Sequence, residues 1–568
     1  MTDIFEFQAS LVEEYKRFST SFTAIRAPDI RKIVDDAQER GDYWPEPLVQ
    51  LNANYQRAES VQSLAERGTL HPSCSDIFRI GKPEGRADDL TLFTHQLQAL
   101  TLAAADQSYV VTTGTGSGKS LAFFLPIVDH VLKHAQPGAR RKTSAIVIYP
   151  MNALANSQRE ELKKFLYGYA TDQMPFSVKS YTGQEDATYR KDVADNPPDI
   201  LLTNFMMLEL LLTRYDENDR RVIDNCAGLH FLVLDELHTY RGRQGADVAL
   251  LVRRLKQRVQ SPKMICIGTS ATMSSGGDTA SQKDVVASTA SRLFGSNVSA
   301  ENVISETLER VTRDDLDLRS IGPTLAARCN RPTAWTDATE FASDPLAVWV
   351  ELNMGVIMSG AHPLRRAPPA TLTHAAEKLA IDAAIDVALA KTALMDFLSA
   401  LSLLAQNGQR SHMAFRLHQF ISGPGKVMAT LEREDARRIT LEQQRFAPGR
   451  QGEGVLLYAT YFCRECGHEY WPVWRESRPE NRFLPREIDD IKAVNDEERA
   501  FGFLTPEVPS LNYDGEQSLP EEWIDFSGHE PKIKPAYRDK IPQRTSVSAD
   551  GRHGTNLDVW FVSGKHRF

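Results

Sequence analysis

Residues 113–120 hold the side chains best suited to chemistry, in the order Thr-Gly-Thr-Gly-Ser-Gly-Lys-Ser. Glycines let successive backbone N–H groups turn inward around phosphates, so this order is typical of a phosphate-binding loop. Lys119 adds a positive charge for the β- and γ-phosphates, and the Ser120 hydroxyl can hold Mg²⁺. The pattern predicts that a nucleoside triphosphate binds along Thr113, Gly114, Thr115, Gly116, Ser117, Gly118, Lys119 and Ser120.

Asp235 and Glu236 form a second candidate site, directly after the apolar run Phe231–Leu234. Two adjacent carboxylates at the end of a buried strand are unfavourable unless a cation lies beside them. Asp235 can hold Mg²⁺ through water, and Glu236 can orient and deprotonate the water that attacks a phosphate. The phosphate loop upstream disfavours the alternative of an exposed acidic turn. We therefore predict Lys119, Asp235 and Glu236 as catalytic residues, with Ser120 and Asp235 as magnesium ligands.

Small residues follow a third apolar run, Met264–Gly268. The hydroxyl side chains of the stretch Gly268-Thr269-Ser270-Ala271-Thr272 could hydrogen-bond to the acidic pair and relay its state to the rest of the protein. We predict Ser270, Ala271 and Thr272 as the coupling residues. The alternative is an ordinary loop, in which Ser and Thr are also common.

The elements that must position these residues are short apolar strands alternating with amphipathic helices. Continuous rather than alternating apolar runs indicate strands buried on both faces, and therefore a parallel sheet covered by helices. Ligands of such α/β sheets bind at the carboxyl ends of the strands, where all of the residues above lie. The predicted strands are Tyr109–Thr113, Ala145–Tyr149, Ser177–Tyr181, Ile200–Thr203, Phe231–Leu234 and Met264–Gly268.

The ordered set of motifs resembles the first RecA-like domain of a superfamily 2 DEAD/DEAH-box helicase. Residues 113–120 resemble motif I, residues 235–238 motif II and residues 270–272 motif III. Thr113 stands where the usual phosphate loop begins with Gly, a variant that these helicases tolerate. Gln96 closes a Phe-Thr-His-Gln stretch that resembles the adenine-reading element. The resemblance implies an α/β RecA-like fold, ATP and Mg²⁺ as cofactors, and Gln96 at the edge of the base.

Three further elements of this resemblance lie between motifs I and II. In this helicase family they contact the sugar-phosphate backbone of a nucleic-acid strand, which implies binding that does not depend on base sequence. The matching residues are Pro150, Asn152, Thr182, Gly183, Thr203 and Asn204.

Two later stretches make the resemblance specific to one group within this helicase family. They are Tyr-Arg-Gly at residues 240–242 and Phe-Arg-Leu-His-Gln-Phe at residues 415–420. Both are similar to large bacterial helicases of the MrfA/Hrq DNA-repair type and to the Druantia-type anti-phage defence helicase. The similarity covers residues 45 to 475 in patches. It implies an ATP-dependent DNA helicase or translocase that acts in DNA repair or anti-phage defence.

The composition is that of an ordinary globular protein, with 42% hydrophobic and 25% charged residues among 568. The net charge of −9 argues against a uniformly basic DNA-coating protein, although a groove needs only local positive charge. No apolar run reaches the roughly 18 residues that span a bilayer, and the N-terminus lacks a signal-peptide pattern. Six cysteines form no disulfide framework. We expect a cytoplasmic protein without membrane association.

We expect four parts along the chain. Residues 1–90 form a helical N-terminal extension, and residues 91–312 form the RecA-like ATP-binding domain. Residues 313–455 contain the Ala- and Leu-rich run Leu372–Gln406, which is typical of a mainly helical accessory domain. Residues 456–568 are polar and rich in Pro, and we interpret them as an irregular segment that begins a truncated or split second half.

Cys463 and Cys466 precede Gly467 in a CxxCG pattern that offers two thiolates to a tetrahedral zinc. Zinc needs four ligands, and the sequence contains no second Cys pair. His468 or another histidine could contribute. Two alternatives stay open, a zinc half-site and a metal-free Cys pair.

Superfamily 2 motors close ATP between two RecA-like domains, and the second domain supplies arginines for the transition state. Its Gln-x-x-Gly-Arg-x-Gly-Arg element does not occur in this sequence. A missing arginine finger typically lowers turnover by on the order of 10³ to 10⁵. We therefore expect full activity to need a second polypeptide or a missing C-terminal half. The alternative is a nucleotide-gated nucleic-acid-binding or assembly subunit that does not translocate.

Overall fold

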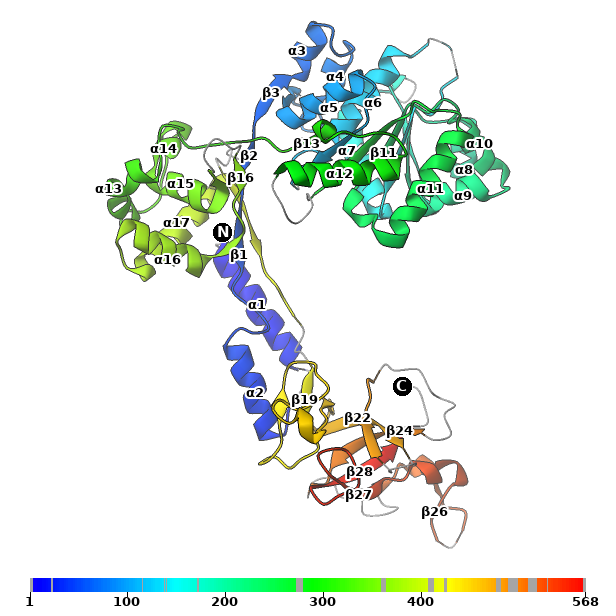
Figure 1. Cartoon of the computed structure of the whole chain (residues 1–568), viewed down its shortest axis with the longest axis vertical. Helices are drawn as coiled ribbons and strands as arrows, with labels where there is room; N and C mark the ends of the chain where they lie inside the picture. The colour runs from blue at the N-terminus through cyan, green and yellow to red at the C-terminus, as the bar shows by residue number, and fades with distance from the viewer. Residues whose placement is uncertain are drawn as a thin grey trace. The chain divides into compact units, whose positions relative to one another are not determined.

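A computed structural model shows two compact units (Figure 1). The first comprises residues 53–315 and 351–367 and is called the parallel-sheet unit below; the second comprises residues 1–52, 316–350 and 368–568. The structure describes residues 4–21, 24–114, 116–136, 138, 140–170, 173–271, 279–358, 364–406, 413–422, 426–476, 482–488, 499–508, 518–528 and 530–564.

Seven parallel strands form the centre of the parallel-sheet unit. They are β7 (Tyr109–Thr112), β8 (Ala145–Tyr149), β9 (Val178–Tyr181), β10 (Ile200–Asn204), β11 (Phe231–Leu234), β12 (Ile265–Ser270) and β13 (Val303–Ser305). Their order in the sheet is β13-β7-β12-β11-β8-β10-β9, and every neighbouring pair is parallel. The helix-covered parallel sheet predicted from the continuous apolar runs is confirmed, and so is the RecA-like α/β fold that the helicase resemblance implies.

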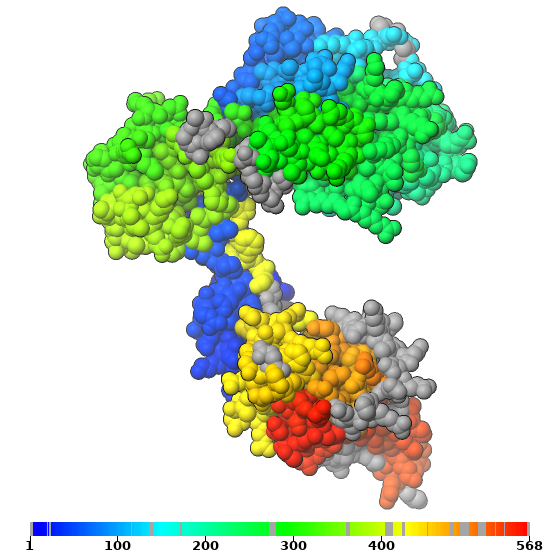
Figure 2. Space-filling view, viewed as in Figure 1, coloured from blue at the N-terminus to red at the C-terminus, as the bar shows by residue number. Residues whose placement is uncertain are grey.

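Helices cover both faces of this sheet (Figure 1). One face carries α5 (Thr94–Ala104), α6 (Leu121–Lys133) and α7 (Asn152–Phe165). The other carries α8 (Ala187–Asp195), α9 (Phe205–Thr213), α10 (Glu217–Asp224), α11 (Gly242–Arg258) and α12 (Thr279–Phe294). In the space-filling view the sheet and its helices, coloured from blue through cyan to green, form one continuous body (Figure 2).

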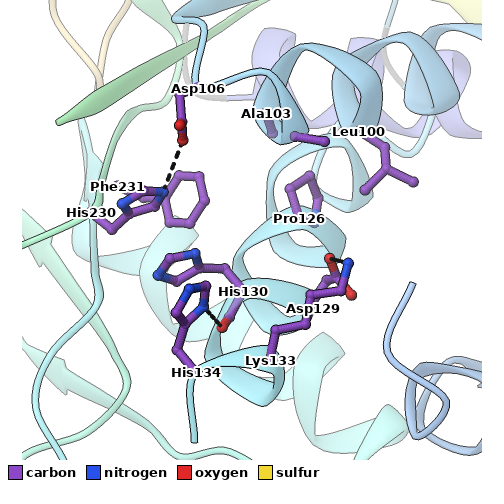
Figure 3. A pocket seen from close by; sticks show the side chains of 11 residues that line it. Leu100, Ala103, Asp106, Pro126, Asp129, His130, Lys133, His134, His230 and Phe231 are labelled. Carbon is purple, nitrogen blue, oxygen red and sulfur yellow. Dashed lines mark hydrogen bonds and ion pairs between the residues drawn. The ribbon is translucent and has the colours of Figure 1, made fainter. Parts of the chain in front are cut away.

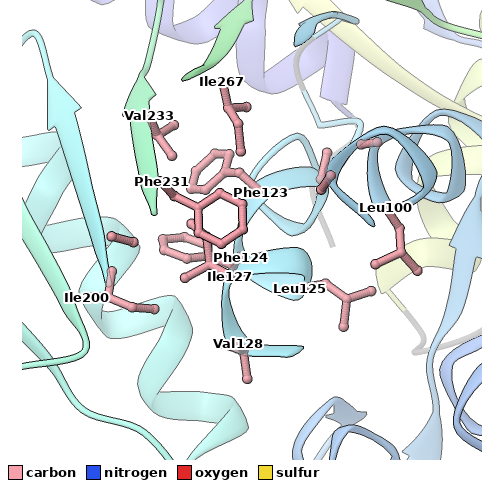
Figure 4. Close-up of a cluster of buried hydrophobic side chains, with 14 of the residues drawn as sticks. Leu100, Phe123, Phe124, Leu125, Ile127, Val128, Ile200, Phe231, Val233 and Ile267 are labelled. Carbon is pink, nitrogen blue, oxygen red and sulfur yellow. The ribbon is translucent and has the colours of Figure 1, made fainter. Parts of the chain in front are cut away.

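Successive strand residues point into opposite clusters, so each face of the sheet has its own core. Val147 belongs to the cluster under α6, and its neighbour Ile146 belongs to the cluster under α11. Figure 4 shows the first cluster, where Phe123 and Phe124 of α6 lie beside Phe231 of β11. All three rings are at most 2% exposed, and burial of one such side chain stabilises the fold by roughly 1.5–3 kcal/mol.

Short elements complete the parallel-sheet unit. They are β2 (Asn54–Tyr55), β3 (Arg57–Ser60), α3 (Val61–Glu66), α4 (Cys74–Ile77), β4 (Arg79–Ile80), β5 (Asp88–Asp89), β6 (Thr91–Phe93), β14 (Leu308–Glu309), β15 (Val356–Ile357) and β16 (Arg365–Arg366). The buried Glu351 carboxylate accepts hydrogen bonds from the N–H groups of Val311 (2.7 Å) and Thr312 (3.0 Å). This carboxylate therefore ties the segment 351–367 back to the unit.

Helices and a small sheet make up one part of the second unit. The helices are α1 (Ile4–Ser21), α2 (Pro28–Glu39), α13 (Leu318–Cys329), α14 (Ala338–Ser343), α15 (Pro345–Val350), α16 (Leu372–Ala383) and α17 (Val387–Gln406). The strands β1 (Leu48–Asn52), β17 (Ala370–Thr371) and β18 (Ala414–His418) pair in the order β17-β1-β18. The Ala- and Leu-rich run is two helices because Ala384 takes a left-handed conformation (φ +53°) and ends α16.

An antiparallel sheet forms the rest of the described second unit. Its strands are β19 (Val427–Ala429), β20 (Ile439–Thr440), β21 (Tyr458–Phe462), β22 (Glu469–Glu476), β23 (Arg482–Pro485), β24 (Arg499–Pro506), β27 (Gln543–Val547) and β28 (Leu557–Ser563); β25 (Ile524–Asp525) pairs separately with β26 (Lys532–Ile533). The sequence pattern did not single out β22 to β24, because Pro472 and charged residues interrupt the apolar run. Within the described ranges, every helix is too short or too polar to cross a lipid bilayer.

Candidate functional site

Three neighbouring strands, β7, β12 and β11, carry the predicted ATP-site residues at their carboxyl ends. β7 leads into the phosphate loop, β11 ends immediately before Asp235, and β12 ends at Ser270. Because the strands are parallel, these ends meet at one edge of the sheet. Two predicted residues, Thr115 and Thr272, lie outside the described residues.

The phosphate loop and the acidic pair meet at Lys119 and Glu236. The Lys119 amine lies 3.8 Å from the Glu236 carboxylate. The Lys119 side chain is only 13% exposed, and its Nζ has no hydrogen-bond partner among the described residues. A buried ammonium group without hydrogen bonds is unfavourable unless an anion completes its shell. A triphosphate supplies such an anion, so the residues present fit ATP.

Thr269 joins the two acidic residues. Its hydroxyl donates to the Asp235 carboxylate and accepts a hydrogen bond from the Glu236 N–H at 3.1 Å. Burial raises the pKa of Asp235, whereas the Thr269 hydrogen bond lowers it. A divalent cation favours the ionised carboxylate, and Mg²⁺ commonly takes one or two carboxylates together with phosphate oxygens and water. Asp235 therefore fits a magnesium ion that is shared with a nucleotide. Ser120, the predicted second ligand, is the N-cap residue of α6 and follows Lys119 directly in the loop.

Glu236 has a strained backbone and a histidine neighbour. Its φ of +53° lies in the left-handed region, which is sparsely populated by residues other than glycine. His238 Nδ1 lies 3.2 Å from the Glu236 carboxylate and 3.3 Å from the Ser270 hydroxyl. In the described residues, Ser270 thus connects to the acidic pair through His238. Ala271 follows β12 directly and has no polar side chain for such a contact.

Gln96 and His95 hold the end of the phosphate loop. The Gln96 amide nitrogen donates to the Gly118 carbonyl at 2.9 Å, and its oxygen accepts from the Phe93 N–H at 2.9 Å. The His95 Nε2 lies 2.9 Å from the Ser117 carbonyl. Gly118 has φ +67°, and a Cβ there would lie 2.6 Å from Gln96. This position therefore requires glycine.

Other contacts shape the start of the same loop. The Thr113 and Ser117 hydroxyls lie 2.6 Å apart, and Gly116 has φ +80°. The Gly114 N–H donates to Glu306 at 3.1 Å. The loop is thus fixed from both ends by side chains outside its own sequence.

The predicted strand-contacting residues lie at or just beyond the carboxyl ends of β8, β10 and β9, the other half of the same edge. The Asn204 amide donates to the Asn152 side chain at 2.6 Å and to the Thr182 carbonyl at 3.0 Å. Asn204 at the end of β10, Asn152 after β8 and Thr182 after β9 therefore lie close together. Pro150 is half-buried directly after β8. Thr203 is fully buried and its hydroxyl donates to a carbonyl inside the sheet, so its side chain does not face this surface.

Glu185 was not predicted, yet it organises this surface. Its carboxylate accepts hydrogen bonds from the Thr182 N–H and hydroxyl and from the Gly183 N–H, at 2.8 to 3.0 Å. A carboxylate that gathers three donors occupies the place that a phosphate oxygen could take. Sequence spacing gave no signal for this role of Glu185, because the contacts depend on loop geometry. For Thr269 there was a signal, since a hydroxyl residue at the end of this strand was expected to hydrogen-bond to the acidic pair.

The Cys pair lies in the second unit. The Cys463 N–H donates to the His468 carbonyl, and the Gly467 N–H donates to the Cys463 carbonyl, both at 2.9 Å. Hydrogen bonds from Cys466 and Glu465 lower the pKa of Cys463. Within the described part of the chain, no group of three or more His, Cys, Asp or Glu side chains is arranged to hold a metal. These residues alone do not fit a four-ligand zinc site.

A cavity of about 320 Å³ lies away from the candidate site (Figure 3). It is lined by His130 of α6, by His134 at the C-cap of that helix, by His230 just before β11, and by Asp106 just before β7. His130 stacks between the other two imidazole rings, at centroid distances of 4.1 Å and 3.9 Å. Because His230 and Asp106 precede their strands, the cavity is at the amino edge of the sheet, opposite the phosphate loop.

Comparison with known proteins identifies the central domain. The family model described as DEAD/DEAH box helicase matches residues 93–279. The ATP-dependent helicase YprA of Bacillus subtilis is 34% identical over 186 residues, 32% of this chain and 23% of that protein. The Druantia protein DruE of Escherichia coli is 25% identical over 295 residues, 32% of this chain and 16% of that protein.

A solved structure, that of the DUF1998 helicase MrfA bound to DNA, aligns with a TM-score of 0.34 and 23% identity. The alignment covers 46% of this chain and 30% of the MrfA chain. The chain thus spans about a quarter or less of the two sequence relatives.

Proposed function

Because residues 93–279 are a DEAD/DEAH box helicase domain, we propose that the chain is the ATP-binding portion of an ATP-dependent DNA helicase or translocase. The observation that carries the proposal is that the Lys119 amine lies 3.8 Å from the Glu236 carboxylate. The lysine amine is buried, and its position suits the binding of a phosphate. Such an arrangement suits transfer of a phosphoryl group to water.

Each residue at this edge has a proposed task. Lys119 and the loop N–H groups bind the phosphates, and Ser120 and Asp235 hold Mg²⁺, which neutralises phosphate charge when bound. Glu236 orients the attacking water and accepts its proton. Through Thr269, His238 and Ser270, the acidic pair is linked to the end of β12. Gln96 reads the base after releasing the Gly118 carbonyl.

The other half of the edge is the proposed strand-binding surface. Pro150, Asn152, Thr182, Gly183 and Asn204 contact the sugar-phosphate backbone, so binding is independent of base sequence. The choice of DNA rests on the resemblance of residues 240–242 and 415–420 to repair-type helicases, which also supports DNA repair or anti-phage defence as the pathway.

We further propose that a second RecA-like domain, from a longer chain or a partner, completes the motor. In the described ranges, the seven-stranded sheet is the parallel one, and the large sheet of the second unit is antiparallel. ATP turnover by the present chain alone is expected to be on the order of 10³ to 10⁵ below that of the completed motor.

The test is ATP binding and hydrolysis by the full chain, with and without single-stranded DNA or RNA. The same assays are repeated after co-purification with the product of the adjacent gene. Lys119→Ala should weaken ATP binding, whereas Glu236→Gln should bind ATP but not hydrolyse it. Lys142→Ala, at an exposed lysine before β8, is the control. Normal turnover in both site variants would overturn the assigned roles. DNA binding with no stimulated hydrolysis in any assembly would favour the non-translocating subunit.

A further inference from the structure

Arg366, outside the matched domain, reaches the phosphate loop through Glu306. We infer that Arg366 is a positioning residue of the nucleotide site, which neutralises Glu306 beside the loop and thereby sets the affinity for a triphosphate. This inference rests on the proposed function, because it takes ATP to bind along residues 113–120.

Glu306 lies where the topology brings a negative charge next to the loop. It is the first residue after β13, the strand that pairs with β7, and β7 leads into the loop. One carboxylate oxygen accepts the hydrogen bond from the Gly114 N–H at 3.1 Å. The other accepts from the Arg366 Nε at 2.9 Å. The two side chains are 21% and 19% exposed, so solvent screens this pair only partly.

Arg366 is held in place from its other side by Tyr55. Its guanidinium donates to the Tyr55 hydroxyl at 2.6 Å and lies 5.1 Å from the centre of that ring. The Tyr55 ring in turn packs against Phe93 and His95, at centroid distances of 5.3 Å and 5.5 Å. Since His95 contacts the Ser117 carbonyl, the same chain of contacts reaches both ends of the loop.

The hairpin of β15 and β16 presents Arg366 at this point. Val356 of β15 packs in a buried cluster with Tyr55 and Leu308, and β15 pairs with β16. A Cβ added to Gly114 would lie 3.2 Å from the Arg366 Nε, so the guanidinium lies directly against the start of the loop. Its position is therefore defined by packing rather than by one surface ion pair.

A carboxylate at this place opposes the binding of ATP, because like charges repel strongly where water is partly excluded. The Arg366 charge cancels that repulsion while Glu306 keeps the Gly114 N–H oriented. Without Arg366, the uncompensated carboxylate should weaken ATP binding by about tenfold, the factor expected for two like unit charges roughly 12 Å apart at an effective dielectric constant of about 20. The effect should be largest for ATP, smaller for ADP and smallest for AMP, because their negative charge falls in that order.

The experiment is calorimetric titration of ATP, ADP and AMP into the full chain and five variants. Arg366→Ala should lose about tenfold in ATP affinity. Glu306→Gln should bind ATP at least as tightly as the wild type. The double variant, Glu306→Gln with Arg366→Ala, should regain most of the affinity that Arg366→Ala alone loses. This rescue is a coupling that a merely structural clamp would not produce. Arg366→Lys, which keeps the charge, should retain most of the affinity. Arg365→Ala, the adjacent arginine on β16, is the matched control.

Each outcome decides the inference. Equal affinities of the wild type and Arg366→Ala would overturn it, and so would equal losses in Arg366→Ala and the double variant. If Arg366→Ala does not fold, as judged by thermal melting without nucleotide, the comparison of Glu306→Gln, Arg366→Lys and the wild type across the three nucleotides decides. A wild type that binds no ATP would overturn the proposed function, and this inference with it.

Discussion

At the scale of single residues, Thr269 is the contact point between the two acidic side chains. Its hydroxyl donates to Asp235 and accepts from the Glu236 N–H. It therefore stabilises the ionised carboxylate, which burial alone would disfavour.

Replacing this hydroxyl tests its role. Thr269→Val keeps the volume and removes the hydrogen bond, so the pKa of Asp235 should rise further. We expect nucleotide binding at low pH to depend less strongly on Mg²⁺. In a plot of nucleotide affinity against pH, the fall on the acidic side should move to higher pH. The measurement is ATP affinity against Mg²⁺ concentration at several pH values. Thr269→Ser should behave like the wild type, and an unchanged profile in Thr269→Val would exclude the role.

His130 makes the stability of the parallel-sheet unit depend on pH. Burial, with the neighbouring His230, His134 and Lys133, lowers the pKa of His130 from 6.5 to about 3. Between these values the unfolded chain binds the proton and the folded chain does not. Stability should therefore be constant above about pH 6.5 and fall as the pH decreases toward about 3.

Thermal melting across this pH range measures the effect. His130→Gln should flatten the fall, because the substituted side chain does not titrate. His374→Gln, at an exposed histidine, is the control and should leave the slope unchanged. Identical slopes for the wild type and His130→Gln would show that other groups dominate the acid sensitivity.

At the scale of elements, the carboxyl edge of the sheet is divided between two tasks. β7, β12 and β11 carry the proposed ATP-site residues, and β8, β10 and β9 carry the proposed strand contacts. Asn204 organises the second half, because its side chain caps α9 by accepting from the Met207 N–H at 2.7 Å and also donates to Asn152 and Thr182.

Two substitutions separate these roles. Asn204→Ala removes the cap and both donated bonds, and it should destabilise the domain by about 1 kcal/mol. Asn204→Asp keeps the capping oxygen and removes the donor. We expect both variants to bind single-stranded DNA more weakly while ATP affinity stays unchanged, with only Asn204→Ala losing stability. Fluorescence anisotropy of a labelled oligonucleotide and thermal melting measure these effects; unchanged DNA affinity in both would argue against a strand-binding edge.

At the scale of the whole molecule, the net charge of −9 disfavours the binding of a polyanion such as nucleic acid over a large part of the surface. The residues proposed to contact a strand offer amides, hydroxyls and backbone N–H groups, and none of them is a lysine or an arginine. Few counterions are then released on binding, because few cationic side chains contact phosphates.

The salt dependence of binding follows from this. The slope of log affinity against log salt should be shallow, at most about −1.4 to −2.1, the values for two or three neutralised phosphates on a single strand. Oligonucleotide affinity measured over a series of KCl concentrations gives the slope. A slope several times steeper would indicate an extended cationic surface instead.

Local patterns in the sequence were enough to predict the central sheet and the edge at which the candidate site residues lie. Continuous apolar runs identify the strands of a buried parallel sheet, and the motifs that follow them in sequence must lie at its carboxyl edge. The positions of Lys119, Asp235 and Asn152 could be predicted in this way because each lies within a few residues of the end of its strand. The pairing of the antiparallel strands in the second unit could not, since it joins distant segments of mixed polarity.

Only the tertiary structure brought together Gly114, Glu306, Arg366 and Tyr55. Glu306 is 192 residues from Gly114 and 60 from Arg366, which is 311 from Tyr55. Sequence periodicity states which face of an element is buried, but not which element is its neighbour. That choice is made by the order of strands in the sheet and by packing between segments far apart in the chain, so contacts of this kind become visible only in the folded molecule.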